Sequence, residues 1–499
     1  MKISTTIPLK SLLLGTLALP FVQCKTTEKK EPEKPNFVFI LIDDMGWKDL
    51  SCYGSEFYET PNIDQLAEEG MRFTDAYAAA SVSSPTRASL LSGKTPARLN
   101  LTDWIGPDKW HPDGKLGNAQ FRDHLPLEEV TLAEQLKKSG YSTFFTGKWH
   151  LGEEGHHPED QGFDINIAGN AAGAPPSYFY PYQRDSWEGT SWPGVIEDLQ
   201  DGEKGEYLTD RLTEESLHFL DTAHHEPFFM LLSHYAVHRP LQAKDNKISH
   251  YQNKADTIQW AVDSTFVYRE NVIERQKQNN PVFAAMIKSV DESVGRILNK
   301  LKSLDIDENT IVFFTSDNGG MSIMLKDWVE REQIATCNKP LRNGKGWLYE
   351  GGIRVPMIVK WPGVTEPGSV SSEPVITMDF YPTILEMSGT EKVPRQHKDG
   401  KSIVPLLQGK TKLDREAIYW HFPHYHASGH EPASAIRMGK YKLIKWYEEK
   451  PLELYNLKKD RAEQNNLADE MPEKAKQMEK ALDNRLREAN ARYPARYKK

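Results

Sequence analysis

The sequence predicts an α/β protein with a large, mostly parallel sheet flanked by helices, followed by a smaller antiparallel sheet and a terminal helix. Two continuous apolar runs, residues 36–42 and 310–316, are rich in β-branched and aromatic side chains. This pattern is typical of strands buried on both faces of a parallel sheet. Helical patterns precede several such runs, as in α/β domains. Beyond residue 410 short strand-like runs follow one another instead.

The elements are expected in this order. Apolar spacing predicts one helix over 131–139 before a strand over 141–146, and another over 285–301 before the strand at 310. Further strands are expected at 227–232, 417–421, 433–438, 441–446 and 452–455, and an amphipathic helix at 472–490. The glycine-, proline- and aromatic-rich residues 151–225 are expected to form long loops over a site. These patterns divide the chain into a main domain that carries the site (36–410) and a C-terminal subdomain (411–499).

The composition limits the class of partner. The chain of 499 residues has a formal net charge of -9, whereas a nucleic-acid binder would show a basic patch or an alkaline pI. We therefore expect no nucleic-acid partner, and an anionic substrate would have to be attracted locally. Apart from Cys24 the only cysteines are Cys52 and Cys337, so no disulfide framework is expected. A single bridge between those two stays open.

The N-terminus is typical of an export signal. Lys2 and Lys10 precede an apolar stretch over 12–22 that is too short to span a bilayer. The stretch ends at Cys24, and a charged, polar segment follows, which resembles a bacterial lipoprotein signal. Gln23 departs from the small residue usual at such sites, so simple secretion is the alternative. The expected segments are a signal peptide over 1–23, a lipidated Cys24 and a tether over 24–35, which anchor an exported protein in the periplasm or at the outer membrane.

A short stretch at residues 83–87, with the sequence S-S-P-T-R, begins a predicted helix that ends at Gly93. Pro85 suits the first turn, where its missing N–H costs nothing. Ser83 therefore lies at a helix N-terminus, where free N–H groups and the helix dipole favour an anion. Arg87, four residues on, lies on the same face. Taken alone, the stretch is no more than an ordinary capped helix.

Two polar pairs follow the two apolar strands. Asp43 and Asp44 come after the first strand, and Asp317 and Asn318 after the second. Ligands of open parallel sheets gather at the carboxyl ends of the strands. Three carboxylates and an amide oxygen form a hard oxygen site suited to Ca²⁺, and less well to Mg²⁺. Either pair by itself would be an ordinary loop start.

Three further segments carry basic residues, and two of them follow predicted strands. They are G-K-W-H-L-G at 147–152, S-H-Y-A-V-H-R-P at 233–240 and L-R-N-G-K-G-W-L-Y-E-G-G-I-R-V-P at 341–356. In the first, Lys148 and His150 lie two residues apart with glycines on either side, so the backbone can turn both toward one centre. A lone histidine or lysine in a loop is usually a solvated side chain.

Together these motifs, in this order, resemble the formylglycine-dependent type I sulfatases of the alkaline phosphatase superfamily. The resemblance runs from residue 36 to residue 457 and implies an alkaline phosphatase-like fold. It also implies that a maturase that accepts serine oxidises Ser83 to formylglycine (3-oxoalanine), and that His234 is structural. The site residues it implies are Asp43, Asp44, Ser83, Asp317 and Asn318 around Ca²⁺, Lys148 and Lys345 on the sulfate, and Ser83, Arg87, His150 and His238 in catalysis.

The chemistry of sulfate esters agrees with this resemblance. A plain serine is a weak nucleophile and would leave a stable sulfated enzyme. In a hydrated aldehyde, one hydroxyl attacks sulfur and deprotonation of the other expels sulfate. The cations would balance charge, His238 would act as the general acid, and His150 would assist the second hydroxyl.

Two alternatives belong to different classes. One is a phosphatase or phosphodiesterase of the same fold with unmodified Ser83 as nucleophile, although such enzymes usually hold two metals with extra His and Asp ligands. The other is a lipoprotein that binds sulfated glycans without cleaving them.

The expected substrate is a sulfated carbohydrate, attacked at a chain end and based on galactose or an N-acetylhexosamine. Aromatic side chains and histidines suit a sugar ring. The candidate recognition residues are Asp103, Trp104, Tyr178, Tyr180 and the cluster at 420–426.

Overall fold

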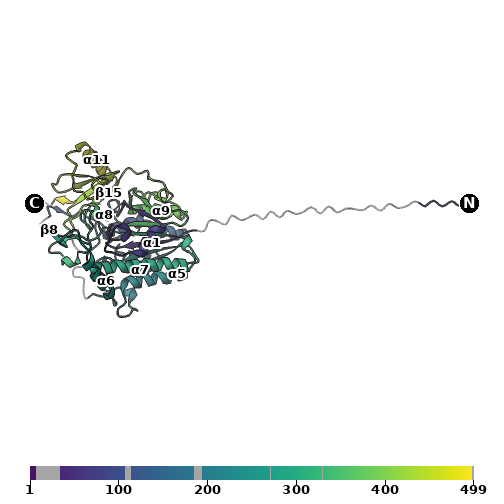
Figure 1. Cartoon of the computed structure of the whole chain (residues 1–499). Coiled ribbons are helices and arrows are strands. Elements are labelled where there is room, and N and C mark those ends of the chain that lie inside the picture. The colour runs from purple at the N-terminus through teal and green to yellow at the C-terminus, as the bar shows by residue number, and fades with distance from the viewer. Residues whose placement is uncertain (7–33, 107–113, 185–193, 270, 329, 497–499) are drawn as a thin grey trace. The chain divides into compact units, whose positions relative to one another are not determined.

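The computed structural model describes residues 1–6, 34–106, 114–184, 194–269, 271–328 and 330–496 (Figure 1). Most of the predicted signal peptide, Cys24 and nearly all of the tether fall on 7–33, outside these residues. The chain separates into two units, Met1–Glu33 and Lys34–Lys499, and every helix and strand below belongs to the second. Within the described ranges, no helix is long and apolar enough to cross a membrane.

The main sheet has eight strands among the described residues, in the order β13-β2-β12-β10-β1-β7-β5-β6. Their bounds are β13 Ser369–Ser371, β2 Met71–Phe73, β12 Met357–Lys360, β10 Thr310–Ser316, β1 Asn36–Ile42, β7 Phe228–His234, β5 Ser142–Gly147 and β6 Ile165–Ile167. Strand β1 is central and parallel to both neighbours, with Ile42 opposite Ser316 and His234. Only the pairs that β12 makes with β10 and β2 are antiparallel. The predicted mostly parallel sheet is confirmed.

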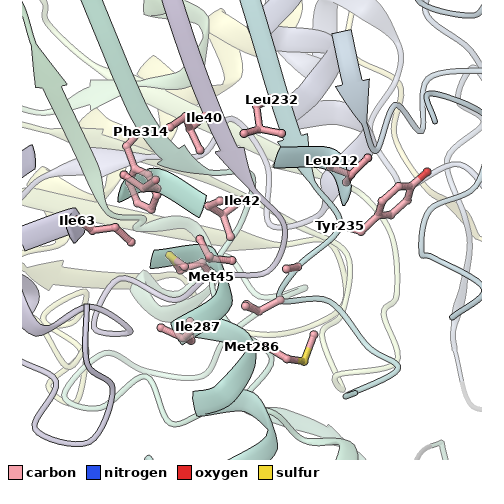
Figure 2. Packing of buried hydrophobic residues seen from close by; sticks show 14 of the residues in the cluster. Ile40, Ile42, Met45, Ile63, Leu212, Leu232, Tyr235, Met286, Ile287 and Phe314 are labelled. Carbon is pink, nitrogen blue, oxygen red and sulfur yellow. The ribbon is translucent and has the colours of Figure 1, made fainter. Parts of the chain in front are cut away.

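Helices cover both faces of this sheet. The helices of this part of the chain are α1 Pro61–Glu69, α2 Ser83–Ser92, α3 Pro96–Leu99, α4 Leu132–Lys138, α5 Leu208–Ala223, α6 Asp245–Thr257, which packs on α7, α7 Pro281–Ser303, α8 Glu350–Ile353, α9 Phe380–Met387 and α10 Val404–Leu407. Side chains of β1 alternate between the faces. Ile40 and Ile42 pack with residues of α1, α5 and α7, whereas Phe39 packs with residues of α2, α4 and α9. Figure 2 shows the first of these layers, where Ile42 and Phe314 face Ile287 of α7.

One predicted region differs from the structure. Long loops are expected over 151–225, but residues 165–167 form β6, the edge strand of the main sheet, and residues 208–223 form α5, a helix of four turns. Its buried residues Leu208, Leu212 and Leu220 lie at helical spacing, and they contribute to the core beneath β5 and β7. The helical spacing of these residues is hard to detect in the sequence, because the aromatic- and glycine-rich residues before α5 have no regular spacing. The described part of the stretch therefore combines loops with the edge strand β6 and the structural helix α5.

The C-terminal region forms a four-stranded antiparallel sheet, as predicted. Its order is β15 (Ile418–Phe422), β16 (Ala433–Met438), β17 (Tyr441–Trp446) and β18 (Glu453–Asn456). The terminal helix α11 (Pro472–Glu488) packs Met478 and Leu482 against Leu443 on one face. The other face packs Trp420 and Ile444 against residues that precede the sheet in the chain.

Smaller sheets complete the fold. Strands β8 (Phe266–Arg269), β9 (Val272–Arg275) and β11 (Ile323–Leu325) form a three-stranded sheet, β3 (Ala76–Tyr77) pairs with β14 (Val375–Ile376), and β4 (Leu116–Gly117) pairs with β19 (Ala495–Arg496). Cys52 and Cys337 are free thiols, so the bridge left open by the sequence does not form.

Candidate active site

The parallel pairing of β1 with β10 brings the two polar pairs together. Ile42 and Ser316 are opposite each other at the strand ends, so Asp43 and Asp317 are the next residues on adjacent strands. The Asp44 amide donates to Asp317 Oδ1 at 3.2 Å, and Asn318 Nδ2 donates to Asp44 Oδ1 at 2.8 Å. The three aspartates are buried, and each offers an oxygen within 4.8 Å of the others.

This carboxylate cluster has the chemistry of a site for a hard dication. Burial, together with repulsion from Asp317 and Asp44, raises the pKa of Asp43 to about 8 although Lys148 and Arg87 lower it. Three buried carboxylates that repel one another are stabilised by a bound cation, and oxygen ligands select Ca²⁺ or Mg²⁺. The donor set therefore fits the divalent metal that the motifs imply.

Ser83 lies at the centre of this cluster. It is the first residue of α2, is 2% exposed, and Val82 is the N-cap. Its Oγ lies 3.3 Å from both Asp43 Oδ1 and Asn318 Oδ1. Gly93 ends the helix in the left-handed conformation that the sequence predicts for a C-terminal glycine. The residue at the helix N-terminus thus borders the metal-type ligands and lies at the positive end of the dipole.

Two lysines pair with the acidic cluster. Lys148, which follows β5, places Nζ 2.7 Å from Asp43 Oδ2 and 3.1 Å from Ser83 Oγ. Lys345 Nζ lies 2.7 Å from Asp44 Oδ1. Burial would raise the pKa of Asp44, but Lys345 and then His238 hold it below its ordinary value. Both lysines predicted to bind sulfate therefore approach the cluster, from two segments that are far apart in the sequence.

Three residues of the loops at the site have left-handed backbone conformations. Asp44 and His150 both have left-handed φ angles, of 61° and 60°, which are uncommon for non-glycine residues. Gly147 has φ +102°, and a Cβ on it would lie 2.0 Å from the Ser233 carbonyl oxygen. Only glycine therefore lets the chain turn between β5 and Lys148.

Arg87 links the cluster to the loop after β5. Its Nε donates to Asp317 Oδ2 at 3.0 Å, and its Nη1 donates to the Lys148 carbonyl at 2.7 Å. Nη1 also donates to Ser233 Oγ at 2.6 Å, and that hydroxyl donates to the same carbonyl. Ser233 is thus a positioning residue that sequence reasoning missed, since a serine at a strand end carries no distinctive signal.

His238 lies at the edge of the cluster, with Nε2 3.7 Å from Asp44 Oδ2 and Nδ1 2.7 Å from the Arg239 carbonyl oxygen. Burial and the nearby Lys345 hold the pKa of His238 well below its usual value. Tyr178 donates to the carbonyl oxygens of Tyr235 and His238, at 2.7 and 2.8 Å, and so fixes the loop that carries this imidazole.

The other two histidines differ in position. His234 is fully buried, lies 2.9 Å from Ser293 Oγ, and has a pKa lowered to about 3 by burial, which is a structural environment. His150 is on the Lys148 loop, with Nε2 2.6 Å from the Ile105 carbonyl oxygen. Its ring centroid lies 6.5 Å from that of Trp104.

The sugar-recognition candidates separate into two groups. Tyr178, Trp420 and Phe422 are at most 1% exposed, and Trp420 donates to the Ala78 carbonyl within the core. These three are structural and offer no face to a sugar. Trp104 and Tyr180 are partly exposed, so they remain candidates.

The fold and this arrangement define a class of protein. A helix N-terminus, an oxygen-rich metal-type cluster and two lysines meet at the carboxyl edge of a mostly parallel sheet, as in hydrolases of the alkaline phosphatase-like fold. The Sulfatase family model matches residues 35–390, and the model described as N-sulphoglucosamine sulphohydrolase, C-terminal, matches residues 343–492.

Relatives and solved structures agree with these matches. A sulfatase of Formosa agariphila is 32% identical over 93% of this chain and 90% of that protein. N-acetylgalactosamine-6-sulfatase of Rattus norvegicus is 32% identical over 83% of this chain and 72% of that protein. The crystal structure of Ps i-CgsB in complex with k-i-k-neocarrahexaose has a TM-score of 0.72 and 29% identity, covering 91% and 93% of the two chains. The chain belongs to the sulfatase family and is a sulfuric ester hydrolase, which confirms the predicted enzyme class.

Proposed function

We propose that this enzyme removes sulfate esters from carbohydrates, using formylglycine formed from Ser83 and a Ca²⁺ ion held by Asp43, Asp44, Asp317 and Asn318. One observation carries the proposal. Ser83 Oγ lies within 3.3 Å of two predicted metal ligands and 3.1 Å from Lys148 Nζ. A hydroxyl with only a structural role would not need a buried ammonium and a carboxylate cluster beside it.

Each residue has a role that follows from its position. Formylglycine would supply the attacking hydroxyl, and the ion would polarise the sulfate and balance its charge. Lys148 and Lys345 would hold sulfate oxygens, and Arg87 would fix Asp317 and the Lys148 loop. His238 would protonate the leaving oxygen once the sulfate anion raises its pKa. His150 would assist the second hydroxyl of the hydrated aldehyde.

The relatives support a sugar substrate. N-acetylgalactosamine-6-sulfatases are among the similar proteins, and the complex with neocarrahexaose is among the similar structures. We infer exo action on sulfated galactose or N-acetylhexosamine, with Trp104 as a recognition residue. We also propose export, lipid anchoring at Cys24 in the periplasm or at the outer membrane, and maturation by an enzyme that accepts serine.

The decisive variant is Ser83→Ala, made in a host that carries a serine-accepting maturase. We expect turnover to fall about 10⁴-fold or more, as for loss of other covalent nucleophiles, with the folded state retained. Ser89→Ala is the matched control, because Ser89 is buried on the same helix and its hydroxyl has no hydrogen-bond partner among the described residues. Retained activity in Ser83→Ala would refute the nucleophile assignment.

Two further measurements test the remaining assignments. Peptide mass spectrometry of the matured enzyme should find formylglycine at position 83, and protein from a host without the maturase should bind Ca²⁺ but remain inactive. A substrate panel of N-acetylgalactosamine 6-sulfate, galactose 4-sulfate and their oligosaccharides, with matched phosphate esters, tests the substrate class. The proposed substrate class would be contradicted if the phosphate esters were cleaved faster than the sulfate esters. It would also be contradicted if none of the sulfated sugars were cleaved.

A further inference from the structure

A second recognition element lies beside the segment that carries Lys345. The structure has a cavity of about 270 Å³ between the Lys345 segment, the β8–β9 hairpin and the C-terminal sheet. This volume is just below the ~300 Å³ at which ligand pockets begin. The cavity can therefore hold a small part of a ligand. Its walls include three aromatic rings and three cationic side chains.

The aromatic walls form a fixed box. The rings of Trp347 and Tyr349 are stacked with centroids 5.6 Å apart, and the Trp446 ring lies 6.4 and 6.2 Å from them. Glu453 accepts hydrogen bonds from Trp446 Nε1 at 3.1 Å and Tyr349 Oη at 2.8 Å. Trp347 Nε1 donates to the Ser428 carbonyl at 2.9 Å. Because the polar groups of all three rings have partners, the ring orientations are set before any ligand binds.

The cationic walls surround these rings. The Arg342 guanidinium lies 3.8 Å from the Tyr349 ring centroid, and Lys450 Nζ lies 5.0 Å from that of Trp446. Arg269 and Lys450 have exposed fractions of 59% and 45%. Lys450 pairs with the partly exposed Glu431, whereas Arg269 pairs with Glu274, whose side chain is only 8% exposed. An exposed pair such as Lys450–Glu431 is worth at most about 1 kcal/mol, so Lys450 can turn to an anionic ligand. Arg269 would contribute its positive charge while it stays paired with Glu274. Among the described residues that line the cavity, three are cationic and Glu453 is the only acid, within a chain of net charge -9.

The cavity is connected to the Ser83 site through one short segment. Asn343, Trp347 and Tyr349 line it, and Lys345 between them contacts Asp44. Two residues span at most ~7 Å, so Lys345 and Trp347 are close along the chain. The 426–429 turn also touches both regions: a Cβ on Gly346 would meet the His426 ring at 2.1 Å, and Ser428 accepts the Trp347 hydrogen bond.

We propose that this cavity binds a second, anionic sugar unit of the glycan whose sulfated end occupies the Ser83 site. A sugar ring would stack on Trp347, the partly exposed ring of the box, and Arg269, Arg342 and Lys450 would bind its sulfate or carboxylate group. The proposal rests on the proposed function, because it needs a sulfated glycan at Ser83. It identifies the site as one that senses the unit next to the cleaved end, beyond the reacting sugar itself.

The test compares oligosaccharides with monosaccharides in the full-length matured enzyme. The variants are the double substitution Arg269→Gln/Lys450→Gln and Trp347→Leu, with folding checked by urea denaturation because Arg269 pairs with the buried Glu274. The control double substitution, Lys476→Gln/Arg496→Gln, removes the same charge from side chains that are 71% and 80% exposed. The probes are a chondroitin 6-sulfate tetrasaccharide, which bears sulfate and carboxylate, and a carrageenan hexasaccharide, which bears sulfate alone, each compared with its sulfated monosaccharide.

We expect the KM for a cleaved oligosaccharide to rise about tenfold in both test variants, with kcat, the monosaccharide KM and the control unchanged. Calorimetry of the same oligosaccharides on Ser83→Ala protein should show the same loss of affinity, so the result does not depend on turnover. A response to the tetrasaccharide alone assigns the carboxylate as the bound anion. Equal effects on monosaccharide and oligosaccharide, or none, overturn the second site while the proposed function stands. Failure of the unaltered enzyme on every sulfated sugar counts against the proposed function, and the binding data then decide the cavity alone.

Discussion

Two buried charge clusters in this protein have the same formal composition and opposite character. The reaction-centre cluster contains Asp43, Asp44, Asp317, Arg87, Lys148 and Lys345. The second cluster, the bridging network, contains Asp75, Glu350, Glu463, Arg354, Arg437 and Lys442. Each has three acids and three bases, so charge balance alone does not distinguish a catalytic site from a structural contact.

The difference lies in how the charges are arranged. In the bridging network cations separate the acids: Arg354 lies between Asp75 and Glu350, and Lys442 between Glu350 and Glu463. In the reaction-centre cluster the three carboxylates converge within 4.8 Å and the cations stand outside them. Alternating charges satisfy one another, whereas converging like charges leave a place for a cation.

The two arrangements serve different parts of the fold. Asp75, Glu350 and Arg354 precede the C-terminal sheet, whereas Arg437 and Lys442 lie within it, so the network joins that sheet to the main sheet. It also fixes α8, which begins five residues after Lys345. The structural cluster therefore holds the segment that carries a residue of the catalytic one.

The largest effect is expected from Asp43→Asn, which tests whether the reaction-centre cluster is catalytic. We expect activity to fall about 10³-fold or more, because a metal ligand supports several kcal/mol of transition-state stabilisation. With metal removed by a chelator, the free energy of unfolding should change by less than about 1.4 kcal/mol, the value of one pKa unit. The reason is that a pKa of about 8 leaves Asp43 largely protonated at neutral pH, and asparagine resembles that neutral form.

Steady-state kinetics, Ca²⁺ calorimetry and urea denaturation in chelator measure these effects. Asp49→Asn is the control, because Asp49 is a buried carboxyl of the same loop with its pKa raised to about 6 by burial. It contacts Thr336 and Gln278 instead of the cluster, so Ca²⁺ binding should survive there. Unfolding of Asp43→Asn would show that the reaction-centre cluster is itself structural.

The bridging network should respond in the opposite way. Arg354→Met removes the cation shared by Asp75 and Glu350, and breaking a buried pair costs about 3–5 kcal/mol of stability. We expect that loss in urea denaturation, with kcat of the remaining folded enzyme changed much less. Arg496→Met, in an ion pair with both side chains about four-fifths exposed, should change stability by less than ~1 kcal/mol. A loss of stability below ~1 kcal/mol in Arg354→Met would contradict the structural role of the bridging network.

The sequence predicted one of these clusters and not the other, for a physical reason. Asp43 and Asp317 follow apolar strands, and parallel pairing forces such residues together, so strand pattern alone indicates a shared site. No comparable rule joins Asp75, Glu350 and Lys442, because they come from a loop, a short helix and the second sheet. Their partnership depends on how the two sheets dock, which no local pattern encodes.

The difference between local patterns and long-range packing also explains which other sequence-based predictions were right and which were wrong. Strands β10, β16 and β17 have the predicted bounds because their apolar runs are bordered by turns. Tyr178 and Trp420 were candidates for binding sugar because composition does not tell a buried aromatic ring from an exposed one. Glu463, a fully buried acid after β18, had no signal among the charged residues around it.

The smallest expected effect is on the pH dependence of stability, which Glu463 in the bridging network should change. Burial and repulsion from Glu350 raise the pKa of Glu463 to about 7, although Lys442 lowers it. Burial also opposes ionisation of Glu350, but Lys442 and then Arg354 hold its pKa below the ordinary value. The network therefore favours one ionised acid and one that keeps its proton.

The folded protein binds the Glu463 proton more tightly than the unfolded chain does, whose glutamates have a pKa near 4.5. Its contribution to stability is therefore fully present below about pH 4.5 and is lost as the pH rises to about 7. The expected loss is on the order of 1–3 kcal/mol across that window, and Glu463→Gln should remove it. The readout is the slope of the unfolding free energy against pH in chelator, which does not depend on the absolute stability of the variant. Equal slopes in the two proteins would mean that Lys442 keeps Glu463 ionised, and that the network holds its charges without a bound proton.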